Sequence, residues 1–167
     1  MPVEIERKFL LADPSWKTGP GCTLRQGYLS RDPQRIVRIR LSDDAAWLTI
    51  KGTTSGATRA EFEYHIPPSD AAELLALCER PLLEKTRYRI EYRGHHWDID
   101  EFHGDNAGLI IAEVELKTES EHVELPPWIG AEVTGDPRYY NSNLSKHPYG
   151  QWPEQKTAAA LLTGNSK

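Results

Sequence analysis

The first strand-like segment of the chain places two carboxylates and one ammonium on a single face. Alternate residues of an extended strand point to opposite faces, so Glu4, Glu6 and Lys8 lie together within the segment 3–10. Carboxylate oxygens suit hard divalent cations such as Mg²⁺, and an ammonium suits phosphate oxygens. The spacing therefore predicts part of a site for a phosphate compound and a metal ion.

The same alternation of charged and apolar residues recurs along the chain. Its acidic members are Glu61, Glu63, Glu91, Asp98, Asp100, Glu113 and Glu115, and its basic members are Arg38, Arg40, Lys51, Arg59, Lys85, Arg87, Arg89 and Lys117. The two signs roughly cancel, so these faces can gather without strong net repulsion. Arginine binds phosphate oxygens in a bidentate manner, and clustered carboxylates bind Mg²⁺ that bridges to phosphate. The full set predicts a polyphosphate held by bases on one side and through metal on the other.

The elements that must position these residues are strands. Alternation predicts strands over residues 3–10, 22–30, 36–41, 47–51, 59–64, 83–93, 96–102 and 109–117. Only one helix is clear between them, over residues 71–78 after Pro67-Pro68, with Ser69 or Asp70 as its N-cap. About eight strands joined mostly by hairpins favour an antiparallel sheet closed into a barrel.

The polarity of the strands leaves two arrangements open. Either the charged face of the sheet lies in solvent, or the barrel has a charged lumen and an apolar exterior covered by helices or a second subunit. Arginine and glutamate occur here in doublets, whereas a solvated face usually carries scattered serine, threonine, glutamine and lysine. Composition thus favours a mainly β (α+β) protein built as an eight-stranded antiparallel closed barrel with a charged lumen and flanking helices.

Composition excludes several classes of protein. The 167 residues suffice for one domain, assigned to residues 1–150 with a C-terminal tail at 151–167. A net charge of -5 argues against a general nucleic-acid partner. No apolar run is long enough to span a membrane, and no signal peptide is evident. Cys22 and Cys78 have no metal-ligand spacing and indicate reduced thiols, so we expect a cytoplasmic location.

The ordered motifs resemble those of the CYTH family, also called triphosphate tunnel metalloenzymes. They are Glu4-Ile5-Glu6-Arg7-Lys8, Arg38-Ile39-Arg40, Thr49-Ile50-Lys51-Gly52, Arg59-Ala60-Glu61-Phe62-Glu63, Lys85-Thr86-Arg87, Ile99-Asp100-Glu101-Phe102 and Glu113-Val114-Glu115, followed by Glu132-Val133-Thr134 and Arg138-Tyr139-Tyr140-Asn141 as in its bacterial branch. Each motif alone is weak, but their order in one short chain is specific. The resemblance implies an eight-stranded tunnel that binds a triphosphate compound with Mg²⁺ or Mn²⁺.

The resemblance also implies roles for individual residues. The leading hypothesis is metal-dependent hydrolysis of inorganic triphosphate (tripolyphosphate) to diphosphate and phosphate. The expected metal ligands are Glu4, Glu6, Asp100, Glu113 and Glu115; the expected phosphate-binding residues are Lys8, Arg38, Arg40, Lys51, Lys85 and Arg87; and Arg59, Glu61, Glu63 and Lys117 have secondary roles. Phosphate-binding bases would offset charge in a loose transition state.

Lys8 and Tyr28 are the candidates for proton transfer. Both lie on inward faces of the first two strands, which a hairpin would make neighbours. An ammonium beside a phenol favours the phenolate, so the pair could accept a proton from water. The alternative is that Tyr28 only hydrogen-bonds within the lumen, and the residues alone do not separate the two.

Other functions of the same fold stay open. They are a class IV adenylate cyclase, a thiamine or nucleoside triphosphatase, and a polyphosphate-binding module without turnover. Residues 119–147 are expected to form short helices that close one end of the barrel, which favours a small-molecule substrate over a polymer. The tryptophans are expected on the barrel exterior, His95-His96 in a turn, and a helical turn or two over 156–162. An apolar exterior also makes a homodimer plausible.

Overall fold

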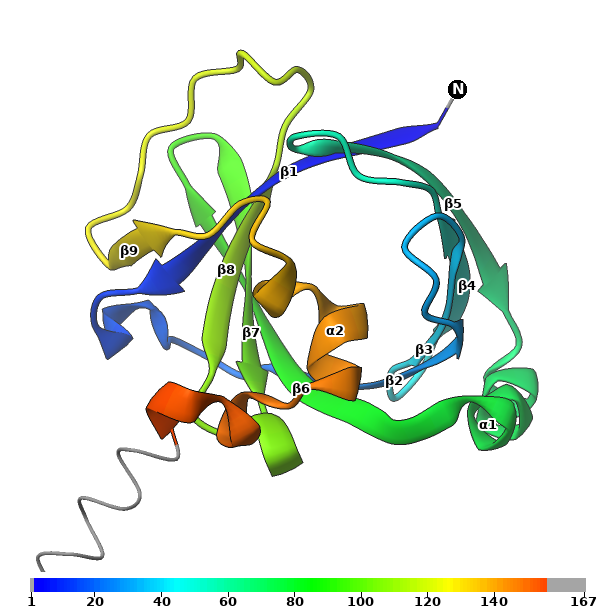
Figure 1. Cartoon of the computed structure of the whole chain (residues 1–167). Coiled ribbons are helices and arrows are strands. Elements are labelled where there is room, and N and C mark those ends of the chain that lie inside the picture. Colours follow the sequence, from blue (N-terminus) through cyan, green and yellow to red (C-terminus); the bar gives the residue numbers. More distant parts are fainter. Residues whose placement is uncertain (1, 156–167) are drawn as a thin grey trace, which may run out of the picture.

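A ring of antiparallel strands surrounds a central lumen in the computed structural model, which describes residues 2–155 (Figure 1). The strands are β1 (Val3–Leu11), β2 (Cys22–Ser30), β3 (Ile36–Leu41), β4 (Ala46–Lys51), β5 (Thr58–Ile66), β6 (Glu79–Tyr92), β7 (His95–Phe102), β8 (Ile110–Glu115) and β9 (Ile129–Glu132). They run in the order β5-β4-β3-β2-β6-β7-β8-β1, and pairing of β1 with β5 closes this ring of eight. The expected closed barrel is confirmed, and β9 pairs with β1 outside the ring.

The helices are short; α1 lies outside the ring of strands, and α2 lies at one end of its lumen. They are α1 (Pro68–Leu77) and α2 (Asn141–Lys146), with 3-10 turns η1 (Pro14–Trp16), η2 (Gly104–Asn106), η3 (Pro137–Tyr139) and η4 (Tyr149–Gln151). Within the described part of the chain, no helix has the length and apolar character needed to cross a membrane.

The register of the strands turns the charged faces inward. Arg40 lies opposite Gln26 of β2 and opposite Trp47 of β4, and Asp98 lies opposite Glu113. Directly opposed residues of antiparallel strands share a face. The alternation along each strand is therefore carried around the ring, and the arrangement with a charged lumen is the one that the chain adopts.

Apolar side chains on the outer faces of β1, β6, β7 and β8 form the main core. This core consists of Phe9, Trp16, Tyr88, Trp97, Ile99, Ala112, Val114, Leu116, Val123 and Trp128. Trp97 is fully buried, and it makes edge-on ring contacts with Phe9 and Trp128. The segments before β2 and before β9 contribute Trp16 and Trp128, so connecting chain covers this side of the barrel.

The other side of the barrel is covered by α1. Proline at its first position fits the helix start, because the missing N–H would have no partner there. Ala71 and Leu75 are buried against Ile39 and Ala46 of the ring. The N-cap is Pro67 without a side-chain cap, so the expected cap by Ser69 or Asp70 is wrong.

One end of the lumen is apolar and is filled by the C-terminal segment. Leu83, Phe102 and Ile111 point inward there and pack against Leu144 of α2. Leu109, Val133, Tyr139 and Trp152 complete this cluster. Short helices thus cover one end of the barrel, while β9 is a strand that alternation did not predict because it has only four residues.

Two further expectations are wrong, and one face stays exposed. His95 lies in β7 and not in the turn, beside His96, which the predicted strand 96–102 already contained; the two-residue turn is Arg93-Gly94, with positive φ at both positions. Trp47 faces the lumen instead of the exterior. Ile50, Phe62 and Tyr64 leave an apolar outer face on β4 and β5 exposed, and the homodimer stays a prediction. The helical turn expected over 156–162 lies outside the described residues.

Candidate active site

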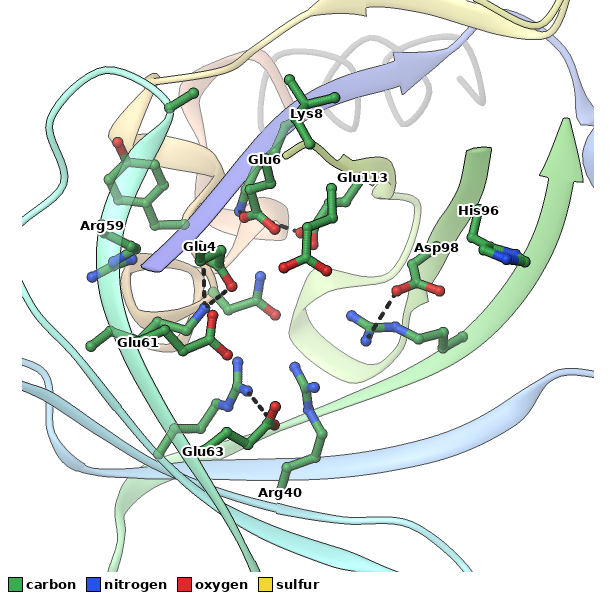
Figure 2. A pocket seen from close by; sticks show the side chains of 18 of the residues that line it. Glu4, Glu6, Lys8, Arg40, Arg59, Glu61, Glu63, His96, Asp98 and Glu113 are labelled. Atoms are coloured by element: carbon green, nitrogen blue, oxygen red, sulfur yellow. Dashed lines mark hydrogen bonds and ion pairs between the residues drawn. The ribbon is translucent and has the colours of Figure 1, made fainter. Parts of the chain in front are cut away.

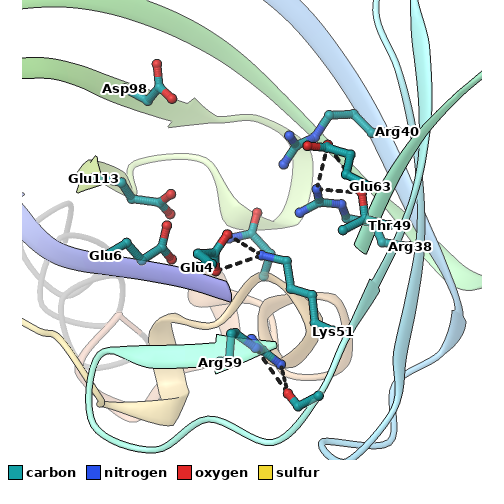
Figure 3. Close-up of polar contacts among 12 residues, drawn as sticks. Glu4, Glu6, Arg38, Arg40, Thr49, Lys51, Arg59, Glu63, Asp98 and Glu113 are labelled. Atoms are coloured by element: carbon teal, nitrogen blue, oxygen red, sulfur yellow. Dashed lines mark hydrogen bonds and ion pairs between the residues drawn. The ribbon is translucent and has the colours of Figure 1, made fainter. Parts of the chain in front are cut away.

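The lumen contains a cavity of about 1300 Å³ lined by nearly all of the expected site residues. Figure 2 shows the carboxylates of Glu4, Glu6 and Glu113 pointing into the same space. Figure 3 shows Arg38 and Arg40 on the wall that faces Glu6 and Glu113 across the lumen. The strands therefore separate an acidic wall, built by β1 and β8, from a basic wall on β3.

The arginines of β3 lie in the basic wall with few compensating charges. Arg38 Nη2 donates to Thr49 Oγ1 at 3.2 Å and lies 3.9 Å from a carboxylate oxygen of Glu63. Arg40 Nε donates to the amide oxygen of Gln26 at 3.2 Å. Burial, with Arg38 and Arg87 nearby, lowers the pKa of Arg40 to about 9. Arg40 is still charged at neutral pH, and an anion in the cavity would stabilise it.

The acidic wall contains carboxylates that repel one another. Burial, with Glu113 and Glu4 nearby, raises the pKa of Glu6 to about 8. Lys8 Nζ lies 3.4 Å from Glu113 Oε1 and 3.8 Å from Glu6 Oε1, and these carboxylates hold its pKa above the ordinary value despite burial. Lys8 thus offsets only part of the negative charge on this wall.

Glu4 of the acidic wall is paired with a base from the other side of the lumen, because the Lys51 side chain extends to it from β4. Lys51 Nζ lies 3.1 Å from both carboxylate oxygens of Glu4 (Figure 3). Burial alone would raise the pKa of Glu4, but Lys51 and a hydrogen bond with Glu61 lower it to about 2. Glu61 carries the proton of that hydrogen bond, because burial and the neighbouring Glu4 raise the pKa of Glu61 to about 8.

Asp100 is held by two bases instead of facing the cavity. Its side chain is 1% exposed, with Lys85 Nζ at 2.8 Å from Oδ2 and Arg87 Nε at 2.7 Å from Oδ1. Burial opposes ionisation of Asp100, but Arg87 and Lys85 hold its pKa well below the ordinary value. Both oxygens already accept hydrogen bonds from cations, so this geometry fits a residue that positions Lys85 and Arg87.

Lys8 and Tyr28 are not brought together by a hairpin, and that expectation is wrong. β1 pairs with β5, β8 and β9, whereas β2 pairs with β3 and β6. Burial raises the pKa of Tyr28 even though Arg38, Arg40 and Lys8 act in the opposite direction. Its hydroxyl accepts a hydrogen bond from Gln26 Nε2 at 3.1 Å. Of the two readings, these contacts favour the hydrogen-bonding one.

Among the residues expected in secondary roles, Arg59 and Glu63 are hydrogen-bonded within the sheet, whereas Lys117 lines the cavity. Arg59 donates from Nε and Nη2 to the carbonyl oxygen of Gly52, so it ties its own hairpin. Glu63 accepts from Thr49 and faces Arg38. Lys117 and Glu115 line the cavity, and burial with Glu4 nearby raises the pKa of Glu115.

The acidic wall has the donor chemistry of a divalent-cation site. Its ligand atoms are carboxylate oxygens, and burial together with neighbouring carboxylates raises the pKa of Glu6 on this wall and of Glu61 on β5, so a cation beside them would favour their ionised forms. Among residues 2–155, no three His, Cys, Asp or Glu side chains already have metal-binding spacing. The residues present therefore fit a cation by chemistry, with ligands that would still have to converge on it.

Two neutral residues of the site were not expected from the sequence. Gln26 shares a face with Tyr28, but glutamine carries no charge that marks a site. Asn141 enters from α2, and Tyr140 beside it lies over the Lys8 ammonium at 5.5 Å. No alternation pattern could place α2 in the lumen, because it reaches the site through tertiary packing alone.

Comparison with known proteins extends over nearly the whole chain. The CYTH domain family matches residues 2–147. The inorganic triphosphatase of Acetivibrio thermocellus is 48% identical over 156 residues, which cover 92% of this chain and 100% of that protein. The inorganic triphosphatase of Nitrosomonas europaea is 36% identical over 146 residues, covering 85% of this chain and 96% of that protein. A solved crystal structure of an inorganic triphosphatase aligns with a TM-score of 0.60 and 34% identity, covering 84% of this chain and 96% of that chain.

Proposed function

Because the chain belongs to the CYTH domain family, we propose that it hydrolyses inorganic triphosphate to diphosphate and phosphate within its lumen. The observation that carries the proposal is a cavity with a basic wall facing an acidic wall. The identity of 48% to an inorganic triphosphatase over 92% of the chain supports the same reaction. A highly charged linear anion, with a cation as its counter-ion, matches both walls.

The basic residues would bind the phosphate oxygens. We assign this role to Arg38, Arg40, Lys51, Lys85 and Arg87. Charge builds up on the leaving diphosphate as the terminal P–O bond breaks, and preorganised cations stabilise it. Arg40 is the strongest candidate, because burial and the neighbouring Arg38 disfavour its positive charge, which a bound anion would stabilise.

The family implies a divalent metal, and Mg²⁺ or Mn²⁺ suits the carboxylate oxygens present. We assign Glu4, Glu6, Glu113 and Glu115 as the residues that would hold it. When bound, the ion would neutralise phosphate charge and acidify a coordinated water. Asp100 would act instead by fixing Lys85 and Arg87, with which it already forms ion pairs.

Lys8 and Tyr28 would orient the groups around the reacting phosphate. The Lys8 ammonium lies between Glu6 and Glu113, and it could donate to a water or a phosphate oxygen there. Tyr28 accepts from Gln26, which leaves its own hydroxyl hydrogen available to an acceptor in the lumen. A protonated phenol at neutral pH agrees with the raised pKa of Tyr28. We therefore propose that Tyr28 donates a hydrogen bond.

The closed end of the barrel supports a small substrate. Leu83, Phe102 and Ile111 end the charged part of the lumen and pack against α2. A polymer threading through the ring would have to displace this apolar cluster. A free triphosphate needs only one open end.

Phosphate release by the purified protein tests the proposal. Triphosphate, diphosphate, ATP and thiamine triphosphate would be compared with Mg²⁺, with Mn²⁺ and with a chelator. We expect metal-dependent turnover of triphosphate above the others, lost in Glu4→Gln and Arg40→Ala. Arg35→Ala, an exposed arginine in the turn before β3, is the matched control and should keep full activity.

Each other outcome contradicts a different part of the proposal. Formation of a cyclic product and diphosphate from ATP would indicate a cyclase. Preferred turnover of thiamine triphosphate or ATP would change the substrate. Tight binding of triphosphate without turnover would indicate a binding module.

A further inference from the structure

A chain of hydrogen bonds through two amides joins Arg40 of the basic wall to Lys85 on β6. Arg40 Nε donates to Gln26 Oε1 at 3.2 Å, and Gln26 Nε2 donates to Asn141 Oδ1 at 3.1 Å. Lys85 Nζ donates to the same Asn141 oxygen at 2.8 Å. Gln26 Nε2 also donates to the Tyr28 hydroxyl at 3.1 Å. Gln26 is 0% exposed, so the bridge is shielded from water.

The chemistry of the two ends fixes the orientation of both amides. Guanidinium and ammonium groups only donate hydrogen bonds. The Gln26 atom facing Arg40 must therefore be its oxygen, which turns its NH₂ toward Asn141. The Asn141 atom facing Lys85 must also be oxygen, and that oxygen accepts from Gln26 as well. Both assignments agree, so the bridge has one consistent direction.

The bridge holds Arg40 differently from the other bases of the lumen. Lys51 lies against Glu4, and both Arg87 and Lys85 lie against Asp100. A carboxylate partner fixes a base but also cancels its charge. An amide oxygen fixes Arg40 and leaves its full charge for an anion in the cavity.

We propose that Gln26 and Asn141 are positioning residues that hold Arg40 and Lys85 in place for triphosphate through an uncharged bridge. The inference rests on the proposed function, because triphosphate is the anion that these bases would bind. It also gives α2 a role beyond closing the barrel. Asn141 is the first residue of that helix, and through it α2, together with Asp100, holds the Lys85 ammonium.

Replacement of the amides by carboxylates of the same shape tests the proposal. In Gln26→Glu, the new carboxylate would pair with Arg40 and compete with phosphate for its N–H groups. We expect KM for triphosphate to rise about 10-fold or more, the scale of one hydrogen bond to a charged group. The melting temperature should change little, because the new ion pair with Arg40 offsets the loss of the amide hydrogen bonds to Asn141 and Tyr28. Asn141→Asp should also raise KM, because it places a second carboxylate beside Lys85, which already pairs with Asp100.

Gln34→Glu is the matched control, since Gln34 lies exposed in the turn before β3 and the change adds the same charge. Its KM and melting temperature should equal those of the wild type. Gln26→Met keeps much of the volume but removes the hydrogen bonds. It should raise KM less than Gln26→Glu, because no competing anion is introduced.

Several results would overturn the bridge. One is a wild-type KM in folded Gln26→Glu, and another is activity that falls only in step with melting temperature across the variants. If Gln26→Glu does not fold, Asn141→Asp decides, and a wild-type KM there overturns the proposal. If the wild type binds triphosphate without turnover, the same comparison is made with calorimetric Kd values. Failure of the wild type to bind or hydrolyse triphosphate contradicts the proposed function, whereas an active wild type with active Gln26→Glu contradicts the bridge alone.

Discussion

Asp100→Asn should destabilise the protein while leaving its affinity for divalent cations largely intact. The Asp100 carboxylate is 1% exposed and bonded to Lys85 and Arg87, at 2.8 Å and 2.7 Å. Removing one partner of a buried ion pair costs about 3–5 kcal/mol, because the remaining charge is left uncompensated. For a chain of this size, that loss lowers the melting temperature by roughly 6–20 °C.

The pH dependence of the loss gives a second check on Asp100→Asn. Burial already lowers the pKa of Lys85 to about 7, even though Asp100 attracts its proton. Without Asp100, Lys85 should lose its proton more readily in the folded state than in the unfolded state. Stability of the variant then rises with pH between the lowered pKa of Lys85 in the folded state and its ordinary pKa in the unfolded state. The difference from wild type should therefore be larger at pH 6 than at pH 9.

Asp98→Asn is the matched control for Asp100→Asn. Asp98 lies on the same face of β7 and pairs at 2.9 Å with Arg89, which is 66% exposed, and more loosely with Arg87 at 3.7 Å. Exposed pairs such as Asp98–Arg89 contribute about 1 kcal/mol or less. Denaturant unfolding and calorimetric titration with Mg²⁺ would be measured on both variants. A stable Asp100→Asn protein that has lost its Mg²⁺ affinity would refute this reasoning and make Asp100 a metal ligand.

Three further outcomes follow from the lumen and the core. The pKa of Glu6 is raised from 4.5 to about 8, so its contribution to stability is present below pH 4.5 and is lost as pH rises to about 8. With a chelator present, the melting temperature of the wild type should fall over this pH range. Equal slopes of melting temperature against pH in Glu6→Gln and wild type would contradict the assignment. Tyr28→Phe keeps the ring but removes the hydroxyl. Loss of a general base would lower kcat by ~10²-fold or more, and we expect a smaller loss for Tyr28→Phe, measured in a pH–rate profile. Phe9→Ala should cost about 3–5 kcal/mol in denaturant unfolding, because Phe9 is buried against Trp97. Arg7→Ala, which breaks a partly exposed pair on the same strand, should cost about 1 kcal/mol or less.

The strands could be predicted from the sequence because their signal is local. The inward charged residues of β1, such as Glu4 and Lys8, alternate with Val3, Ile5 and Phe9, which must face the opposite way; Arg7 is the one charged residue in that outward set. The same rule placed Asp100 on the inward face correctly. It could not show that Lys85 and Arg87 would occupy both of its oxygens, because that depends on which side chains meet across two strands.

The parts that sequence did not show depend on long-range packing. β1 and β2 are consecutive strands without a mutual ladder, because β1 closes the ring between β5 and β8. Gln26 has no charge that marks a site, and the motif Arg138-Tyr139-Tyr140-Asn141 did not show that Asn141, on a six-residue helix, would reach the lumen. Trp47 is apolar by composition but follows the phase of Lys51 on β4, and strict phase would have placed it in the lumen.

The closure of the ring by its first strand has a consequence for biosynthesis. β1 leaves the ribosome first, yet Glu6 pairs with Glu115 and Val3 pairs with Ala60. Contacts this distant in sequence form slowly, since a long loop must close before they gain any energy. The acidic wall therefore meets the basic wall only after nearly the whole domain has been translated. A nascent chain with β2 to β5 in place has its arginines bonded to Gln26, Thr49 and Glu63, but it lacks Glu113 of the acidic wall, so the proposed site is complete only when the last strands of the ring arrive.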